Sequence, residues 1–200
     1  MANPHVAYFE SSVASIDLEG KVAQCVSTVA STQTPITFEV PYSHVVLGVG
    51  EQPATFGTPG VKEHAFFMKD VSDCVQLRNR IQQQLELAEF LIDPDARADA
   101  LRFVVVGGGP TGVEFAGTLS DFLFSDLIKR FPALMQHAQV VLVQSGANIL
   151  PVFDEVLQEK AMKTFERLRV KVMTNVKVCV VQLYHLYSSS SLSATRQSTL

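Results

Sequence analysis

The sequence predicts an α/β fold in which a β-meander comes first and a βαβ-type domain follows. Short β-branched runs alternate in the second half with segments that have helical spacing, and this alternation is typical of a parallel sheet. A glycine-rich turn, Gly107–Gly112, stands between one such run and the segment after it. The first 50 residues instead hold strand-like runs separated by turn residues, which indicates antiparallel pairing.

The meander is predicted from runs with strand periodicity that are bounded by turn signals. In chain order the expected elements are strands over 6–9 and 12–18, a turn at 19–21, and strands over 22–26, 36–40 and 45–50. The hairpin lies around the turn at 19–21. The last run, which ends in Val49-Gly50, is apolar throughout, so it predicts a buried strand of a central sheet.

A loop and a long helix are expected next. Residues 51–60 contain two glycines and two prolines, so they predict a loop at the carboxyl end of the preceding strand, where open α/β sheets bind ligands. Helical spacing predicts a helix over 71–91, capped by Asp70 or Ser72. One broad face of that helix collects its apolar side chains: Val75, Leu77, Ile81, Leu85, Ala88 and Leu91. Asp93-Pro94-Asp95 then predicts a short polar segment and a domain boundary.

The central motif is LRFVVVGGGPTGVEFAG, from Leu101 to Gly117. Its apolar run predicts a buried parallel strand, and Gly107, Gly109 and Gly112 have GxGxxG spacing. Gly107 permits a sharp turn, Gly109 lets a pyrophosphate approach bare backbone, and Gly112 lets the helix pack close to the strand. The helix N-terminus then faces the phosphates, and Pro110 suits its first turn. The motif predicts a Rossmann-like dinucleotide domain, while the alternative is a glycine-rich turn without a ligand.

The rest of this domain is expected to follow the same alternation. Its predicted elements are an amphipathic piece over 125–131 that Pro132 ends, a strand over 139–143, a helix over 154–168, and strands over 170–173 and 176–181. The parallel crossovers are expected to be right-handed. Residues 182–200 contain four consecutive serines and no periodicity, so they predict a disordered tail.

Composition excludes some classes of function. A net charge of −4 argues against a broad nucleic-acid-binding face. The three cysteines are far apart and form no CxxC pair, so no metal site or dithiol centre is expected, and small buried side chains are the favoured interpretation. For His44, His64 and His185 we favour surface or hydrogen-bonding roles over metal binding. No apolar run is long enough to span a bilayer, and the N-terminus lacks the pattern of a targeting segment.

Three blocks of the sequence resemble successive blocks of type II (alternative, rotenone-insensitive) NADH dehydrogenases. They are HVVLGVGEQPATFGTPGVKEHAFFMKDVSD, RFVVVGGGPTGVEFAGTLSDF and VVLVQSGANILPVFDE. That family consists of two-dinucleotide flavoproteins of the pyridine nucleotide-disulphide oxidoreductase type, which pass electrons from NAD(P)H through FAD to a quinone. The resemblance runs from about Tyr8 to Val181. It implies part of a FAD-binding domain over 1–92, an NAD(P)H-binding Rossmann-like domain over 93–181, and a disordered or aberrant tail over 182–200.

The resemblance also implies cofactor contacts. Val49 and Gly50 are expected to lie against FAD. NAD(P)H is expected to be held by the glycine-rich turn, whose residues are Gly107, Gly108, Gly109, Pro110, Thr111 and Gly112. Since the sequence has no second GxGxxG and no counterpart of the family's second flavin motif, quinone site or membrane helices, an internal fragment is expected.

The implied function is an NAD(P)H:ubiquinone oxidoreductase that lies peripherally on the mitochondrial inner membrane, with a homodimer allowed and no nucleic-acid partner. The alternative is a catalytically inactive NAD(P)-binding fragment. A disulfide reductase of the same architecture is disfavoured, because the sequence contains no CxxC.

Three positions need separate comment. Glu114 has two interpretations: a carboxylate stabilised by the helix dipole, or, by resemblance, a catalytic residue where nicotinamide meets flavin. Gln144 ends the strand at the position where NAD-specific folds carry an acid for the ribose hydroxyls. A neutral amide permits NADPH without demanding it, since residues 145–148 hold no arginine. Ala54 stands where the family pattern has a polar residue, which weakens one expected cofactor contact.

Overall fold

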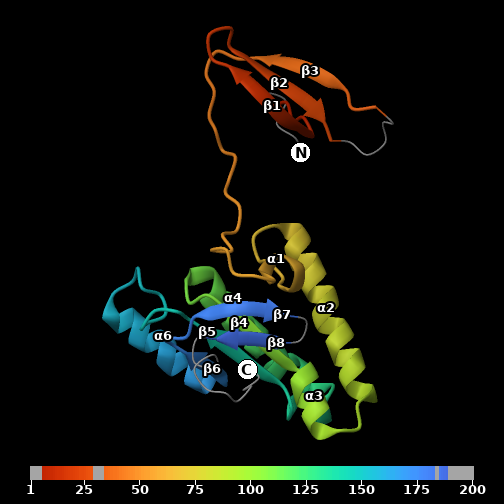
Figure 1. Ribbon diagram of the computed structural model, residues 1–200, viewed down its shortest axis with the longest axis vertical. Helices are drawn as coiled ribbons and strands as arrows, with labels where there is room; N and C mark the ends of the chain where they lie inside the picture. The colour runs from red at the N-terminus through yellow and green to blue at the C-terminus, as the bar shows by residue number, and fades with distance from the viewer. Residues whose placement is uncertain (1–5, 29–33, 183–184, 189–200) are drawn as a thin grey trace. The chain divides into compact units, whose positions relative to one another are not determined.

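The computed structural model describes residues 6–28, 34–182 and 185–188 of the chain. The chain divides after Glu51 into two compact units, and Figure 1 shows the elements of each. The first unit is a small antiparallel sheet. The second unit contains a parallel sheet and all the helices that the structure describes.

The first unit is a three-stranded meander in the order β1-β2-β3. Its strands are β1 (Ser11–Asp17), β2 (Val22–Ser27) and β3 (Thr37–Pro41), and each pairs antiparallel with the next. The Asp17 carboxylate fixes the first turn, because its Oδ1 accepts hydrogen bonds from the N–H groups of Glu19 and Gly20. The predicted hairpin and third strand are therefore confirmed, whereas residues 6–9 form no strand.

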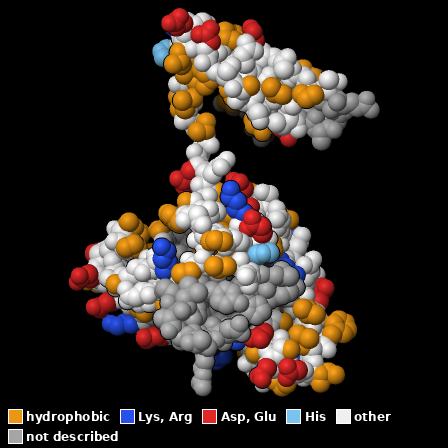
Figure 2. Space-filling view, viewed as in Figure 1, with side chains coloured by type: hydrophobic (Ala, Val, Ile, Leu, Met, Phe, Trp, Pro, Cys, Tyr) orange, Lys and Arg blue, Asp and Glu red, His pale blue; other side chains and the backbone are white. Residues whose placement is uncertain are grey.

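The predicted strand over residues 45–50 is wrong. This segment has no regular secondary structure, and the side chains of Val46 and Val49 are 92% and 90% exposed. Figure 2 shows apolar side chains at the surface along this connection. A buried parallel strand needs a neighbouring strand on each edge, and no strand among the described residues pairs with this one. The apolar run therefore has the composition of a central strand but lacks the partners that would bury it.

The second unit is built on the parallel sheet β4-β5-β6. Its strands are β4 (Arg102–Val106), β5 (Gln139–Val143) and β6 (Val170–Met173), with Val106 opposite Val143 and Val143 opposite Met173. All three were predicted at these positions. The order strand, helix, strand, helix, strand is confirmed, and the fold is an α/β Rossmann-like one.

A second, two-stranded sheet follows. It pairs β7 (Val178–Gln182) with β8 (His185–Ser188) in antiparallel fashion. The prediction that residues 182–200 lack secondary structure is therefore wrong for Gln182 and for His185–Ser188. The remainder of that prediction, at 183–184 and 189–200, lies outside the described residues.

The helices of the second unit are α1 (Val61–His64), α2 (Val71–Phe90), α3 (Pro94–Ala100), α4 (Pro110–Asp121), the π-helix η1 (Phe122–Asp126), the 3₁₀ helix η2 (Leu127–Lys129), α5 (Pro132–Met135) and α6 (Glu155–Arg167). Asp70 caps α2 in a capping box with Asp73, as one of the two predicted caps. The segment predicted only as a polar boundary forms α3, because Asp93 caps it by accepting a hydrogen bond from the Ala96 N–H. Within the described ranges no helix combines the length and the apolar character needed to cross a bilayer.

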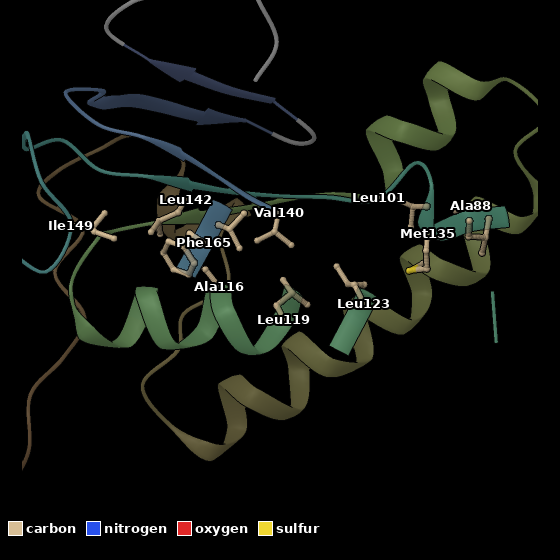
Figure 3. Close-up of a cluster of buried hydrophobic side chains, with 12 residues drawn as sticks. Ala88, Leu101, Ala116, Leu119, Leu123, Met135, Val140, Leu142, Ile149 and Phe165 are labelled. Atoms are coloured by element: carbon tan, nitrogen blue, oxygen red, sulfur yellow. The ribbon is translucent and has the colours of Figure 1, made fainter. Parts of the chain in front are cut away.

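The core of the second unit lies between the parallel sheet and α4. Figure 3 shows Ala116 and Leu119 of α4 facing Val140 and Leu142 of β5, with Phe165 of α6 beside them. Ala116, Val140 and Leu142 have no exposed surface. Of the apolar face predicted for α2, only Ala88 is fully buried, and Val75 remains 42% exposed. The packed part of the molecule is thus the βαβ unit that carries the glycine-rich turn.

Candidate functional site

The glycine-rich turn lies where β4 ends and α4 begins. Gly107 has a φ of +116°, a conformation that L side chains rarely adopt, and its N–H donates to the carbonyl oxygen of Val143 at 2.9 Å. The turn is thereby tied to the carboxyl end of β5. The predicted role of Gly107, a sharp exit from the strand, agrees with this geometry.

Gly112 is the point of closest approach between the helix and the turn. A Cβ atom at this position would lie 2.0 Å from the Gly107 carbonyl oxygen, which no real structure tolerates. Gly109 differs, because a Cβ atom there would meet no heavy atom within 4 Å. The motif therefore holds one glycine required by close packing and one glycine that faces open space.

The first turn of α4 offers hydrogen-bond donors. Gly109 is the N-cap residue and has no side chain to cap the helix, and Pro110 occupies the first turn. The first intrahelical bond runs from the Val113 N–H to the Gly109 carbonyl oxygen at 3.0 Å. The N–H groups of Thr111 and Gly112 precede it, and such groups have no intrahelical acceptor. Together with the positive end of the helix dipole they form a site suited to an anion.

Gln144 lies directly beside this turn, as its place at the end of β5 predicts. Its side-chain Oε1 accepts a hydrogen bond from the Gly108 N–H at 3.0 Å, and its Nε2 donates to the carbonyl oxygen of Asn148 at 3.3 Å. The side chain therefore links the turn to the loop that follows β5. It also places a neutral amide where an acid would stand in an NAD-specific fold.

Leu150 is a contact that sequence reasoning missed. Its N–H donates to the carbonyl oxygen of Gly108 at 2.6 Å, and its φ is +51°. The neighbouring Ile149 is 1% exposed, which anchors the loop in the core. Both backbone groups of Gly108 are thus occupied. No sequence signal marked Leu150. A positive φ is uncommon for a residue other than glycine, so the sequence does not predict the loop conformation that brings the Leu150 N–H to Gly108.

Glu114 lies one turn further along α4, on the same face as Pro110. Its side chain is exposed and has no hydrogen bond or ion pair with another described residue. The carboxylate is therefore available to a ligand near the start of the helix. Both interpretations of Glu114 remain predictions.

The predicted flavin contacts belong to the first unit. Val49 is exposed, and Gly50 has a φ of +69° with no heavy atom within 4 Å of an added Cβ. Ala54, in the loop of the second unit, is also exposed. The structure therefore does not enclose any of these three residues, and their contacts with FAD stay predictions.

The histidines show no sign of a metal centre in the part of the chain that the structure describes. His44 Nδ1 lies 3.2 Å from the Ser43 hydroxyl oxygen, and the side chain of His185 lies outside the described residues. No group of three or more His, Cys, Asp or Glu side chains that could hold a metal ion occurs among the described residues.

Comparison with known proteins places this geometry in a known family. The family model for pyridine nucleotide-disulphide oxidoreductases matches residues 3–187. The chain is 38% identical over 172 residues to the external alternative NADH-ubiquinone oxidoreductase of Yarrowia lipolytica, and this match covers 86% of this chain and 30% of that protein. It is 35% identical over 178 residues to the external alternative NAD(P)H-ubiquinone oxidoreductase B1 of Solanum tuberosum, which covers 88% of this chain and 31% of that one.

Among solved structures, NDH2 of Plasmodium falciparum in complex with NADH is similar to this chain. The TM-score is 0.80 at 26% sequence identity, and the match covers 92% of this chain and 37% of that one. The chain thus spans about a third of the length of the proteins that it resembles.

Proposed function

The chain belongs to the pyridine nucleotide-disulphide oxidoreductase family, and on that premise we propose that it is part of a FAD-dependent NAD(P)H:quinone oxidoreductase. The observation that carries the proposal is the open space above Gly109 at the uncapped start of α4. The names of the curated relatives, which are mitochondrial NADH- or NAD(P)H-ubiquinone oxidoreductases, support the same function.

The glycine-rich turn fits the diphosphate of a nicotinamide dinucleotide. Gly109 leaves the backbone bare, and the N–H groups of Thr111 and Gly112 point from the first turn of α4. Gly107, Gly108 and Pro110 shape the same turn. When bound, NAD(P)H supplies the hydride for the reaction. The work of these residues is to bind the nucleotide and to orient it.

Gln144 is proposed to contact the adenosine ribose. Its amide can hydrogen-bond a ribose hydroxyl, and unlike a carboxylate it does not repel a 2′-phosphate. Residues 145–148 offer no arginine to pair with such a phosphate. We therefore expect NADH and NADPH to bind with similar affinity.

Glu114 is proposed to act near the nicotinamide end of the site. It is exposed and free of described partners on the helix that begins at the phosphate turn. A carboxylate near a bound anion needs a functional reason, since the helix dipole alone favours the anion there. The expected role is to orient the nicotinamide or the acceptor beside it.

The flavin contacts are proposed for the longer protein that the relatives represent. Val49 lies exposed on the connection, and a Cβ atom added to Gly50 would meet no heavy atom within 4 Å. The proposed contact of these two residues with FAD therefore rests on the resemblance. The quinone acceptor, the peripheral position on the mitochondrial inner membrane and a homodimer are proposed on the same basis.

A second candidate is a nucleotide-binding protein without turnover. The exposure of Val46 and Val49, where the family places its flavin domain, favours it. Two measurements on the purified chain separate the candidates: quenching of NADH and NADPH fluorescence on titration, and flavin absorbance after purification. Binding with bound flavin supports the oxidoreductase, binding by a colourless protein supports the second candidate, and no binding of either nucleotide contradicts both.

A further inference from the structure

A hollow lies at the end of the parallel sheet that is opposite to the glycine-rich turn. It is a surface cavity that is open to solvent, with a volume of about 450 Å³, and the residues that matter in its lining are Arg102, Phe124, Met135, His137, Gln139 and Arg169. Arg102 begins β4 and Gln139 begins β5, whereas the glycine-rich turn follows the last residue of β4. Five strand residues rise roughly 13 Å in total, so the two sites are separate. Ligands of open α/β sheets bind at the carboxyl ends of the strands, and this cavity lies at the amino ends.

The strand register brings two arginines to this edge. Arg102 is opposite Gln139, and Val140 is opposite Val170, so Arg169 follows on the other side of Gln139. Two strand spacings of about 4.8 Å place the Cα atoms of Arg102 and Arg169 roughly 10 Å apart. Both side chains line the cavity, and arginine is long enough for the two guanidinium groups to meet one ligand between them.

The lining is basic and holds no carboxylate. Besides the two arginines the lining contains His137, and its other polar groups are the side-chain amides of Gln136 and Gln139 and backbone groups. Arg102 pairs with Asp99 at 2.9 Å, but the Asp99 side chain is 66% exposed, so the ion pair is solvated and weak. A ligand anion can therefore compete for the Arg102 guanidinium at small cost.

Arg169 is held in place by its backbone and by an aromatic ring. Its φ is +59°, which is uncommon for a residue with a Cβ, and its guanidinium lies 5.4 Å from the centre of the Phe124 ring. Phe124 comes from the π-helix η1, and single π turns are frequent at functional sites. The left-handed residue that follows the end of α6 and the π turn of η1 thus both line this cavity.

We propose that this cavity binds the phosphate group of a small organic phosphate. Two guanidinium groups match a phosphate dianion, because each can donate two parallel hydrogen bonds to its oxygens. Phe124 and Met135 provide an apolar wall for the organic part. The same chemistry is offered by a soluble phosphate monoester and by a phospholipid headgroup. The site is independent of the nucleotide at Gly107–Gly112.

The first experiment titrates the ¹⁵N-labelled chain with sn-glycerol 3-phosphate and follows the backbone amides by NMR. We expect saturable shifts at residues 137–139 and 169–170, with a dissociation constant on the order of 1 mM. Acetate at equal ionic strength should produce much smaller shifts, since one negative charge engages one guanidinium. Shifts confined to residues 107–113, or no shifts at all, would overturn the proposal.

Variants test which side chains hold the phosphate. Arg169→Gly removes a guanidinium at a position where glycine adopts positive φ readily, so the fold is expected to persist. It should weaken binding at least tenfold, and Arg102→Gln should do the same. Arg169→Lys keeps the positive charge but lacks the paired donors of a guanidinium group, so its affinity for the phosphate should lie between those of the parent chain and Arg169→Gly. Arg130→Gln is the matched control, since Arg130 stacks on Phe131 and does not line the cavity. Equal losses in Arg130→Gln and Arg169→Gly would contradict the assignment.

A second arm identifies the source of the phosphate. The chain is sedimented with phosphatidylcholine vesicles that contain or lack phosphatidic acid. The site is assigned to a lipid headgroup if the parent chain binds the vesicles that contain phosphatidic acid, Arg169→Gly does not bind them, and Arg130→Gln still does. Binding of the monoester without vesicle binding assigns it to a soluble phosphate. Unfolding midpoints of all variants, measured alongside, show that a loss of binding is not a loss of fold.

Discussion

The side-chain Oε1 of Gln144 accepts a hydrogen bond from the backbone N–H of Gly108 at 3.0 Å, although the two residues are 36 positions apart. The parallel pairing of β4 with β5 creates this contact. Val106 lies opposite Val143, so the segments that follow the two strands leave the sheet side by side. One side chain thereby supports the glycine-rich turn and stands at the proposed ribose position. Changes at Gln144 should therefore alter both loop stability and nucleotide preference.

Gln144→Glu is expected to discriminate between the two nucleotides. Glutamate keeps an oxygen acceptor for the Gly108 N–H but adds a negative charge that repels a 2′-phosphate. The ratio of the NADPH to the NADH dissociation constant should rise about tenfold, which corresponds to about 1.4 kcal/mol. Fluorescence titration with both nucleotides measures it. Gln144→Ala, which lacks charge and acceptor alike, should weaken both nucleotides without changing their ratio, and an unchanged ratio in Gln144→Glu would refute the ribose assignment.

Gly109→Val should weaken nucleotide binding at least tenfold while preserving the fold. The backbone of Gly109, with φ −75° and ψ 176°, suits any residue, and an added Cβ meets nothing within 4 Å. The new side chain would fill the space assigned to the diphosphate, so NADH affinity should fall tenfold or more, about 1.4 kcal/mol at least. Gly48→Val is the matched control, because Gly48 also faces open space but lies in the other unit. Retained affinity in Gly109→Val would place the nucleotide elsewhere.

Gly112→Ala and Gly117→Ala should shift stability in opposite directions. The first adds a methyl group 2.0 Å from the Gly107 carbonyl oxygen and must displace the start of α4, at a cost of about 1–3 kcal/mol. Gly117→Ala adds a methyl group 3.7 Å from the Phe165 ring, which is an ordinary van der Waals contact. Replacing a glycine inside a helix by alanine stabilises the protein by about 0.5–1 kcal/mol. Urea unfolding of the two variants tests this. The interpretation of the turn is wrong if both behave alike.

The lowered pKa of Asp73 predicts that the start of α2 is sensitive to acid. The N–H groups of Asp70 and then of Lys69 hydrogen-bond its carboxylate and lower the pKa of Asp73. A lowered folded-state pKa contributes stability that is present above the unfolded value of about 3.9 and is lost as the pH falls through the folded value. The melting temperature of Asp73→Asn should thus lie below that of the parent at pH 7 and converge with it in acid.

A control for this effect lies at the other end of the same helix. Glu89→Gln removes an exposed carboxylate near the C-terminus of α2, where the helix dipole disfavours negative charge. It should not lower the melting temperature at neutral pH. A parallel pH dependence in both variants would mean that overall charge, and not the cap, sets the acid response.

The sequence predicted the βαβ unit because its determinants are local. A β-branched run, three glycines and an amphipathic helix each constrain only a few neighbouring residues, and the structure has all of them where they were expected. The strand over residues 45–50 failed for the opposite reason, since its burial depends on strands that must come from elsewhere in the chain.

The site was partly predictable for the same reason. The placement of Gln144 beside the turn followed from parallel pairing, whereas its bond to Asn148 and the support from Leu150 depend on a loop conformation with a positive φ. Strand β8, at the start of the serine-rich stretch, was not predicted, and it pairs antiparallel with β7. Long-range contacts of this kind leave no periodic signal.

Gly108 is hydrogen-bonded through its N–H to Gln144 and through its carbonyl oxygen to Leu150. A loop secured on both sides has little conformational entropy left to lose, so an incoming diphosphate meets a surface that is already organised. Association at this turn should therefore proceed in a single kinetic phase, whose observed rate rises linearly with nucleotide concentration instead of levelling off at a slow isomerisation.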